Sequence, residues 1–346
     1  MKNKVLIRVD GNEVIASGHV MRCLSIARQI KKQNGEAVFV TADEKPRQMI
    51  EEAGFECRVL GTDYRTPGTE VEIIRNVLKS ENAGVLLVDS YFVTEEYFSG
   101  LKDLAKLVYI DDYLNKSFPV SSLVHYSVFE GTERAEELYT GKKLPDLLFG
   151  GKYAPLREEF STNRITIRKD VKKVLITTGG ADHLGMSLRL LDKIKSQPYF
   201  DMITWQVISG RFNTHLAQLR EFAKEYDQVE ILVNVQNMAE RMRECDVAIS
   251  ASGTTLYELA AVGVPTICFE VADNQKGAEN WETQGYMMYA GNAEEDMEAC
   301  LNRCLGCLET YIHGYEERRI RSERLNTVVD GKGAERIAEY LLKDFG

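Results

Sequence analysis

Short apolar segments rich in valine, isoleucine and leucine alternate with helical patterns along most of the chain, and this alternation constrains the fold more than any other feature. Continuous apolar runs of this kind are typical of parallel strands buried on both faces, because the intervening helices cover the sheet. The pattern predicts an α/β protein with two doubly wound, Rossmann-like domains. The expected strands are Lys4–Asp10, Ala37–Ala42, Glu56–Leu60, Gly84–Ser90, Leu107–Asp112, Val171–Gly180, Ile203–Gly210, Val229–Val235, Asp246–Gly253 and Pro265–Val271. The expected helices include Val20–Lys32, Val71–Lys79, Leu184–Lys195, Thr214–Tyr226, Met238–Glu244 and Thr255–Val262.

The segment Lys143–Asp170 interrupts this rhythm with two prolines, a glycine pair and many charges, as a connection between domains does. A chain of 346 residues is long enough for two domains with separate cores. We therefore expect a first domain over 1–155 and a second over 156–346, facing each other across a cleft. The last helical pattern, KGAERIAEYLLKDFG, could pack on either domain.

The charge balance restricts the class of partner. A net charge of −10 argues against a broad nucleic-acid-binding face, because such a face must be basic. Apolar runs fall short of the roughly 20 residues that span a bilayer, and Arg8 and Asp10 interrupt the run in which a signal peptide would need an unbroken core. We expect a cytoplasmic protein with no membrane span and a small-molecule substrate, whose anionic groups would meet a local positive site.

The seven cysteines are expected to be reduced thiols, because they are scattered along a chain without a signal peptide. Cys300, Cys304 and Cys307 have the spacing of some iron–sulfur ligands, but the same spacing places them on one side of an amphipathic helix. We favour the helix and expect no metal there. Asp111 and Asp112 are also not expected to share a metal, since adjacent residues at a strand end point to opposite faces.

His19 stands where the loop after the first strand enters a helix, and we take it as the candidate general base. The positive end of the helix dipole favours a neutral imidazole, which accepts a proton. The alternative is that His19 only caps the helix or hydrogen-bonds the backbone. Gly11 and Gly18 favour the catalytic interpretation, because glycines permit the close backbone approach that anionic ligands require. Asp10, also in this loop, could orient His19.

Two glycine-rich loops in the second half predict a nucleotide site. In the sequence SASGTTLYEL, a strand ends at Ser252 and Gly253, and a helix opens with Thr254 and Thr255, whose free amides would hold a diphosphate. Glu258, one turn later, would accept hydrogen bonds from a ribose diol, although it could equally be a solvated helix residue. The loop TTGGAD supplies the second element, with Gly179 and Gly180 near the pyrophosphate.

These motifs carry a resemblance to a known family. IASGHVMRCLSIARQI and SASGTTLYELAAVGVPTICFEVADNQ resemble segments of the UDP-2,4-diacetamido-2,4,6-trideoxy-β-L-altropyranose hydrolases of pseudaminic acid biosynthesis, and VDSY, IDDY, GGKYAPLREEF and TTGGAD follow in the family's order. The family is similar in fold to the GT-B glycosyltransferases, including the MurG type. The resemblance implies metal-independent hydrolysis at the anomeric carbon, which releases UDP and a free diacetamido sugar. We expect no cofactor, and a single displacement by water would invert the anomeric carbon.

The resemblance also assigns residues. It makes His19 the general base and Glu258 the ribose ligand, and it puts Gly179, Gly180 and the loop over Ser252–Thr255 at the nucleotide. Two departures stand out: Gly11 replaces a small side chain near the sugar, and Ser252 stands where a glycine is usual. The residues expected to bind the sugar part of the substrate are Asp10, Gly18, Arg22, Tyr91, Asn274 and Gln275.

Two other functions remain open at this point. A GT-B glycosyltransferase would pass the sugar to an acceptor hydroxyl rather than to water, with the same base and the same UDP site. A binding protein without catalysis would hold UDP but leave His19 unexplained.

Overall fold

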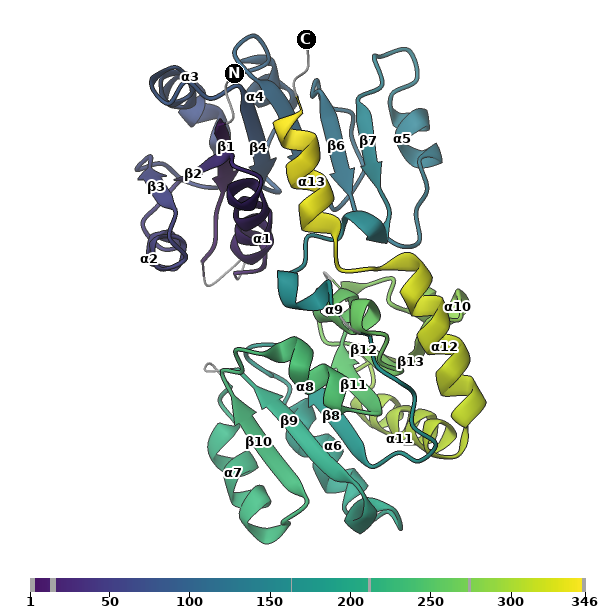
Figure 1. The fold of residues 1–346 in the computed structure, drawn as a ribbon. Coiled ribbons are helices and arrows are strands. Elements are labelled where there is room, and N and C mark those ends of the chain that lie inside the picture. Colours follow the sequence, from purple (N-terminus) through teal and green to yellow (C-terminus); the bar gives the residue numbers. More distant parts are fainter. Residues whose placement is uncertain (1–3, 13–16, 163, 211–212, 273–274, 344–346) are drawn as a thin grey trace. The chain divides into compact units, whose positions relative to one another are not determined.

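The computed structural model describes residues 4–12, 17–162, 164–210, 213–272 and 275–343 (Figure 1). The chain forms two compact units. Unit 1 contains the residues up to Glu158 together with those from Gly331 onward, and unit 2 contains Glu159–Asp330. In the described part of the chain, no helix is both long and apolar enough to cross a membrane.

Unit 1 is built on a parallel sheet of seven strands, counted over the described residues, in the order β3-β2-β1-β4-β5-β6-β7. All its neighbouring strands pair in parallel, so crossover connections must link them across the faces. The order reverses direction between β1 and β4, which makes their carboxyl ends the switch point of this sheet. The strands are β1 (Lys4–Val9), β2 (Glu36–Thr41), β3 (Glu56–Val59), β4 (Val85–Asp89), β5 (Lys106–Ile110), β6 (Ser122–His125) and β7 (Asp146–Phe149).

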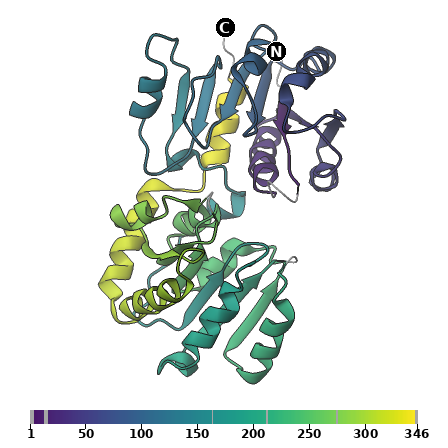
Figure 2. The same ribbon diagram turned by 180° about the vertical axis from the view of Figure 1, so that it is seen from behind.

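Helices cover both faces of this sheet. The apolar sides of α1, α2 and α13 pack on one face, and those of α3, α4 and α5 pack on the other. Figure 1 shows α13 lying beside α1, and Figure 2 shows the same unit from behind. The helices are α1 (Gly18–Lys32), α2 (Arg47–Glu52), η1 (Pro67–Glu70), α3 (Val71–Ser80), α4 (Glu95–Ser99), α5 (Glu133–Leu138), η2 (Gly151–Tyr153), η3 (Glu158–Phe160) and α13 (Gly333–Leu342), with η1–η3 being 3₁₀ turns and η3 spanning the division between the units.

Helix α13 corrects the expected domain limits of 1–155 and 156–346. The division falls at Glu158, inside the predicted connecting segment, but the last helix returns to unit 1. Its apolar side, which includes Ile337 and Leu341, is buried in the same core as α1 and β1. Gly333 permits this return, because a Cβ there would overlap the backbone of Ala154.

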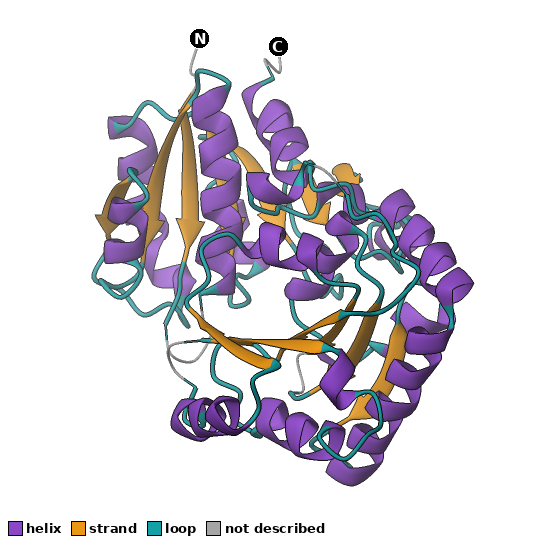
Figure 3. Ribbon diagram, turned by 60° about the horizontal axis from the view of Figure 1, so that its bottom comes forward, coloured by secondary structure: helices purple, strands orange, loops and turns teal. Residues whose placement is uncertain are grey.

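Unit 2 has a parallel sheet of six strands within the described residues, in the order β10-β9-β8-β11-β12-β13. Its switch point lies between β8 and β11, and the carboxyl ends of these strands lead into the two glycine-rich loops. Figure 3 shows the strands in orange with purple helices around them. The strands are β8 (Lys173–Thr177), β9 (Thr204–Ser209), β10 (Val229–Val233), β11 (Val247–Ala251), β12 (Thr266–Glu270) and β13 (Met288–Asn292).

The helices of unit 2 also form two layers. The apolar sides of α6, α7 and α11 share one core, whereas α9 packs between α8 and α12. The helix α11 includes the three clustered cysteines, as the sequence predicts. The helices are α6 (Met186–Ile194), η4 (Phe200–Met202), α7 (Leu216–Glu225), α8 (Met238–Glu244), α9 (Thr255–Val262), α10 (Glu279–Thr283), α11 (Met297–His313) and α12 (Tyr315–Val328).

Candidate functional site

The switch point of unit 1 brings the candidate base next to a buried carboxylate. Strand β4 ends at Asp89, and α1, which follows the neighbouring strand β1, carries His19 in its first turn. The imidazole Nδ1 of His19 lies 2.5 Å from Oδ1 of Asp89. Both side chains are buried, with exposed fractions of 8% and 0%.

The charge state of Asp89 decides the tautomer of His19. Burial alone would raise the pKa of Asp89, but the Arg22 guanidinium and His19 outweigh burial and hold this pKa well below its usual range. An ionised carboxylate only accepts hydrogen bonds, so Nδ1 of His19 must donate. In this tautomer the lone pair of an uncharged imidazole lies on Nε2.

Arg22, a predicted sugar ligand, is buried next to His19 and Asp89, and its guanidinium is hydrogen-bonded to protein side chains. Its guanidinium donates to both oxygens of Asp89, at 2.6 and 2.5 Å, and to both oxygens of Asp112, at 2.9 Å each. It also donates to the hydroxyl of Tyr126 at 2.5 Å. Burial opposes the charge on Arg22, but the two carboxylates outweigh burial and raise its pKa well above the ordinary value. We infer that Arg22 holds Asp89 in place.

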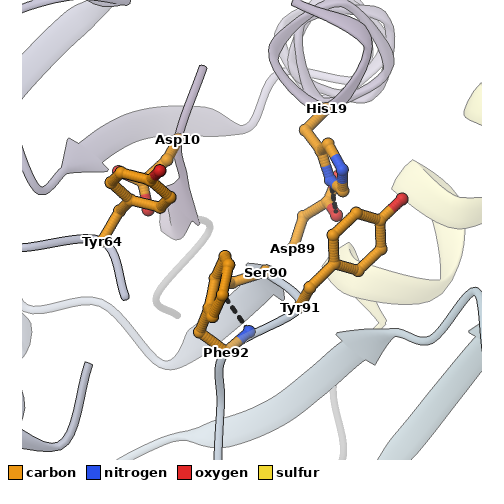
Figure 4. A pocket seen from close by; sticks show the side chains of 7 residues that line it. All are labelled: Asp10, His19, Tyr64, Asp89, Ser90, Tyr91 and Phe92. Carbon is orange, nitrogen blue, oxygen red and sulfur yellow. Dashed lines mark hydrogen bonds and ion pairs between the residues drawn. The ribbon is translucent and has the colours of Figure 1, made fainter. Parts of the chain in front are cut away.

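A small pocket opens beside His19, with about 200 Å³ of space that includes its open mouth. Only about 10 Å³ of this space admits a water-sized sphere, so the enclosed part has room for about one water molecule. Tyr91 stands edge-to-face with His19 at a ring separation of 4.5 Å and donates its hydroxyl to Asp112 at 3.0 Å. The pocket is lined by Asp10, His19, Tyr64, Asp89, Ser90, Tyr91 and Phe92 (Figure 4).

Asp10 lines the pocket but is not the residue that orients His19. One of its oxygens accepts from the Ala42 amide at 2.8 Å and the other from Arg8 at 2.5 Å. Arg8 also donates to Glu70, so a buried ion network fixes Asp10 from behind. Gly18 opens α1 and is exposed, with open space where a Cβ would lie.

Sequence reasoning missed the roles of Asp89 and Asp112. Both belong to motifs that the sequence analysis quotes, VDSY and IDDY, and both lie within one residue of the end of a predicted strand. That position was the available signal, because strand ends at a switch point are where functional side chains gather. The neighbouring Asp111 turns elsewhere, since its Oδ1 accepts from the amides of Tyr113 and Leu114.

The switch point of unit 2 contains the predicted phosphate loops. After β8 the chain turns at Gly179, whose φ of +85° favours glycine. The next residue, Gly180, is exposed, and its carbonyl packs against Gly210 so closely that a Cβ on Gly210 would overlap it. Asp182 then accepts hydrogen bonds from the first amides of α6, at 2.8 and 3.1 Å.

The loop after β11 leads directly into α9. The amide and hydroxyl of Ser252 both donate to the Phe269 carbonyl at 2.9 Å, which ties the loop to β12. Gly253 and Thr254 are exposed, and Thr255 is the first residue of α9.

Within the described residues the amides of Thr254 and Thr255 donate to no protein acceptor. These amides and the helix dipole form a local positive site. Glu258 follows in the first turn and is partly exposed.

The loop after β12 holds the remaining predicted residues. Oε1 of Gln275 accepts from the Val271 amide at 3.0 Å, so part of this side chain braces its own loop. Glu270, buried at the end of β12, accepts from the Ala278 amide at 3.0 Å and holds the other end of the loop. The predicted sugar ligand Asn274 lies outside the described residues. Over the described part of the chain, no group of three His, Cys, Asp or Glu side chains could hold a metal ion.

Residues 173–298, in unit 2, match the glycosyltransferase family 28 C-terminal domain. A Methanocaldococcus jannaschii protein named as uncharacterized is 28% identical over 76% of this chain. The match covers only 55% of the length of that protein. The Bacillus subtilis spore coat polysaccharide biosynthesis protein SpsG is 23% identical over 97% of this chain and 96% of its own length. The UDP-2,4-diacetamido-2,4,6-trideoxy-beta-L-altropyranose hydrolase of Campylobacter jejuni is 23% identical over 80% of this chain and 95% of its own length.

Solved structures show the same fold. Acinetobacter baumannii MurG matches with a TM-score of 0.70 at 11% identity, over 99% of this chain and 100% of that one. The UDP-GlcNAc 2-epimerase of Neisseria meningitidis, solved with UDP-GlcNAc bound, matches with a TM-score of 0.67 at 13% identity, over 99% of this chain and 100% of that one. The chain thus has the GT-B fold with two Rossmann-like domains, and its homologues include proteins named as altropyranose hydrolases.

Proposed function

We propose that this chain, a GT-B protein with homologues named as UDP-sugar hydrolases, is an enzyme that hydrolyses a UDP-linked sugar at its anomeric carbon. The sugar would be a 2,4-diacetamido-2,4,6-trideoxy sugar of the pseudaminic type, made for a surface polysaccharide or a related glycan. The observation that carries the proposal is the buried His19–Asp89 pair beside a small pocket of unit 1.

In this proposal His19 is the general base. Nε2 takes a proton from a water molecule, and the water oxygen attacks the anomeric carbon while the bond from that carbon to the UDP oxygen breaks. Asp89 fixes the ring and stabilises the imidazolium that forms. UDP leaves with both bonding electrons, and one displacement inverts the anomeric centre.

The nucleotide would bind to unit 2 through backbone groups. The free amides of Thr254 and Thr255 at the start of α9 would hold the diphosphate, with Gly179 and Gly180 close to it. Glu258 would accept hydrogen bonds from the ribose diol. Gln275 and Asn274 would contact the sugar or the phosphates from the loop after β12.

A glycosyltransferase that uses a UDP-sugar donor is the second candidate. The match of residues 173–298 to a glycosyltransferase domain favours it, as does a homologue from Leuconostoc citreum named as an N-acetylglucosamine transferase. The base and the nucleotide site would be the same, and only the acceptor would differ.

One experiment separates these functions. The protein is incubated with a panel of UDP-linked acetamido and diacetamido sugars without any acceptor, and free sugar and its anomer are followed by NMR. Hydrolysis predicts rapid release of UDP and of the inverted sugar. Turnover only after a glycan or lipid acceptor is added would support transfer, and UDP binding without any turnover would contradict both enzymes.

A further inference from the structure

Five side chains of unit 1 form a closed ring of contacts that includes the candidate base. His19 contacts Asp89 through Nδ1, and Arg22 donates to both oxygens of Asp89. The Arg22 guanidinium also donates to both oxygens of Asp112. The Tyr91 hydroxyl donates to Asp112 at 3.0 Å, and the Tyr91 ring returns to His19 at a ring separation of 4.5 Å. Asp112 is therefore linked to His19 along two separate routes.

The two routes fix different parts of the imidazole. The contact with Asp89 fixes one ring atom, Nδ1, but a single hydrogen bond lets the ring turn, because the outer torsion of a histidine side chain has a broad minimum. The Tyr91 ring stands edge-to-face with the imidazole at an interplanar angle of 82° and limits that turning (Figure 4). Together the two contacts define the direction in which Nε2 of His19 points.

The turn that carries Asp112 is held firmly. The preceding residue, Asp111, is 2% exposed, and its amide donates to the Val124 carbonyl at 3.0 Å. Its carbonyl accepts from Nδ1 of the buried His125 at 2.6 Å. Leu114 has a φ of +45°, a left-handed conformation that bulky residues rarely adopt and that persists only where the surroundings hold the backbone. Asp112 is thus a fixed point from which other side chains can be oriented.

We propose that Asp112 is a positioning residue, which orients the His19 imidazole along both routes. This role rests on the proposed function, because it assumes that His19 takes a proton from water. The described residues that line the pocket beside His19 do not include Asp112, so Asp112 acts through its neighbours and not on the substrate. A displacement of about 1 Å at a reacting group can cost about 10²-fold in rate, which sets the size of the expected effect.

The orientation of His19 is measured by NMR in the free protein. The chain has five histidines, so selective labelling gives few imidazole signals, and the His19→Asn variant identifies those of His19. The neighbouring Tyr91 ring displaces the signals of the His19 ring protons through its ring current. We expect this displacement to be largely lost in Asp112→Ala, and also in Tyr91→Phe, which keeps the ring but removes the hydroxyl that Asp112 holds. If packing alone held Tyr91 in place, Tyr91→Phe would leave the signals unchanged.

Turnover of UDP-2,4-diacetamido-2,4,6-trideoxy-β-L-altropyranose measures the consequence for the reaction. Asp112→Ala should lower kcat about 10²-fold, whereas KM and the Kd for UDP should stay within about twofold of the wild-type values. Asp112→Asn keeps one acceptor oxygen and should recover part of the loss. In a His19→Asn background, Asp112→Ala should cause no further loss, because no base remains to be oriented.

The variants are chosen so that the fold survives. The side chain of Asp112 is 23% exposed and Tyr91 is 39% exposed, so neither truncation leaves a sealed cavity. Tyr91→Phe also leaves both carboxylates of Arg22 in place. Asp103→Ala is the matched control, because it removes an exposed carboxylate outside this ring of contacts and should change neither the NMR signals nor kcat.

The outcomes separate the two proposals. If the His19 signals are the same in wild type, Asp112→Ala and Tyr91→Phe, Asp112 does not orient the ring, and the proposed function stands. If the signals change but kcat of Asp112→Ala stays within about twofold of wild type, the positioning role is wrong for turnover. If wild type releases sugar from none of the UDP-sugars in the panel, the proposed function is wrong, and the role of Asp112 in the reaction falls with it.

Discussion

At the scale of single residues, the account depends on a histidine whose tautomer is set by its neighbours. Asp89 accepts from Nδ1 of His19, and Arg22 keeps that carboxylate ionised. His19→Asn removes the base but keeps a polar side chain of similar size. We expect turnover to fall by about 10²–10⁴-fold while the dissociation constant for UDP stays unchanged. Steady-state kinetics and calorimetry measure the two quantities, and near-normal turnover would remove His19 from the mechanism.

Asp89→Asn tests the partner of the base. The variant loses the fixed tautomer and leaves Arg22 with one carboxylate fewer, so turnover should fall by about 10²–10⁴-fold. The free energy of unfolding at pH 7 should fall by about 3–5 kcal/mol, because a buried ion pair loses one partner. Asp103→Asn, at an exposed carboxylate, should change little.

The pH dependence of that stability difference follows from the lowered pKa of Asp89. Since the pKa is lower in the folded protein than in the unfolded chain, the stabilisation is complete above about pH 4 and is lost as the pH falls below it. Denaturant titrations of wild type and Asp89→Asn should therefore differ most near pH 7 and converge in acid. A difference that grows as the pH falls would contradict the assigned charge.

Glu258 is the residue through which ribose recognition is tested. If it accepts from the ribose diol, wild type should bind 2′-deoxy-UDP about tenfold more weakly than UDP, and Glu258→Ala should bind both nearly equally. Calorimetry on the four combinations gives the coupling between the side chain and the hydroxyl. A preference for UDP that persists in the variant would mean that other groups recognise the ribose.

At the scale of elements, the sequence predicted what depends on local pattern. The limits of α8 and α9 agree with the expectation, and the expected strands lie within a few residues of those observed. The strands β6, β7 and β13 were missed. Two of them have only four residues, and β13 contains a glycine, so none has the long apolar run by which a buried strand is recognised.

The candidate site was predictable only in part, for a related reason. The loops that carry His19, Gly179 and Thr254 could be found because each one follows an apolar run. The pairing of His19 with Asp89 could not, because these residues are 70 positions apart and meet only when β1 and β4 become neighbours in the sheet. Strand order is set by the packing of the whole unit and not by local pattern.

The return of α13 to unit 1 makes a testable prediction about this element. Ile337 is fully buried in the core of unit 1, so Ile337→Ala should lower the free energy of unfolding of that unit by about 2–5 kcal/mol. Glu339→Ala, on the exposed side of the same helix, is the control and should change little. Denaturation followed by circular dichroism measures the loss, and equal effects of both variants would contradict the packing.

At the scale of the whole molecule, the account explains how an acidic chain could bind a nucleoside diphosphate. The net charge is −10, and the proposed diphosphate site uses backbone amides and a helix dipole in place of lysine or arginine side chains. Each unit would contribute one part of the substrate site, at the switch point of its own sheet. The proposed reaction therefore requires one substrate to reach both switch points.

A crystal structure of His19→Asn with an uncleaved UDP-sugar tests that requirement most directly. The account predicts uridine diphosphate against the loops after β8 and β11, and the sugar ring at the mouth of the pocket beside residue 19, with a water molecule between that residue and the anomeric carbon. A nucleotide bound elsewhere, or an anomeric carbon far from residue 19, would contradict it.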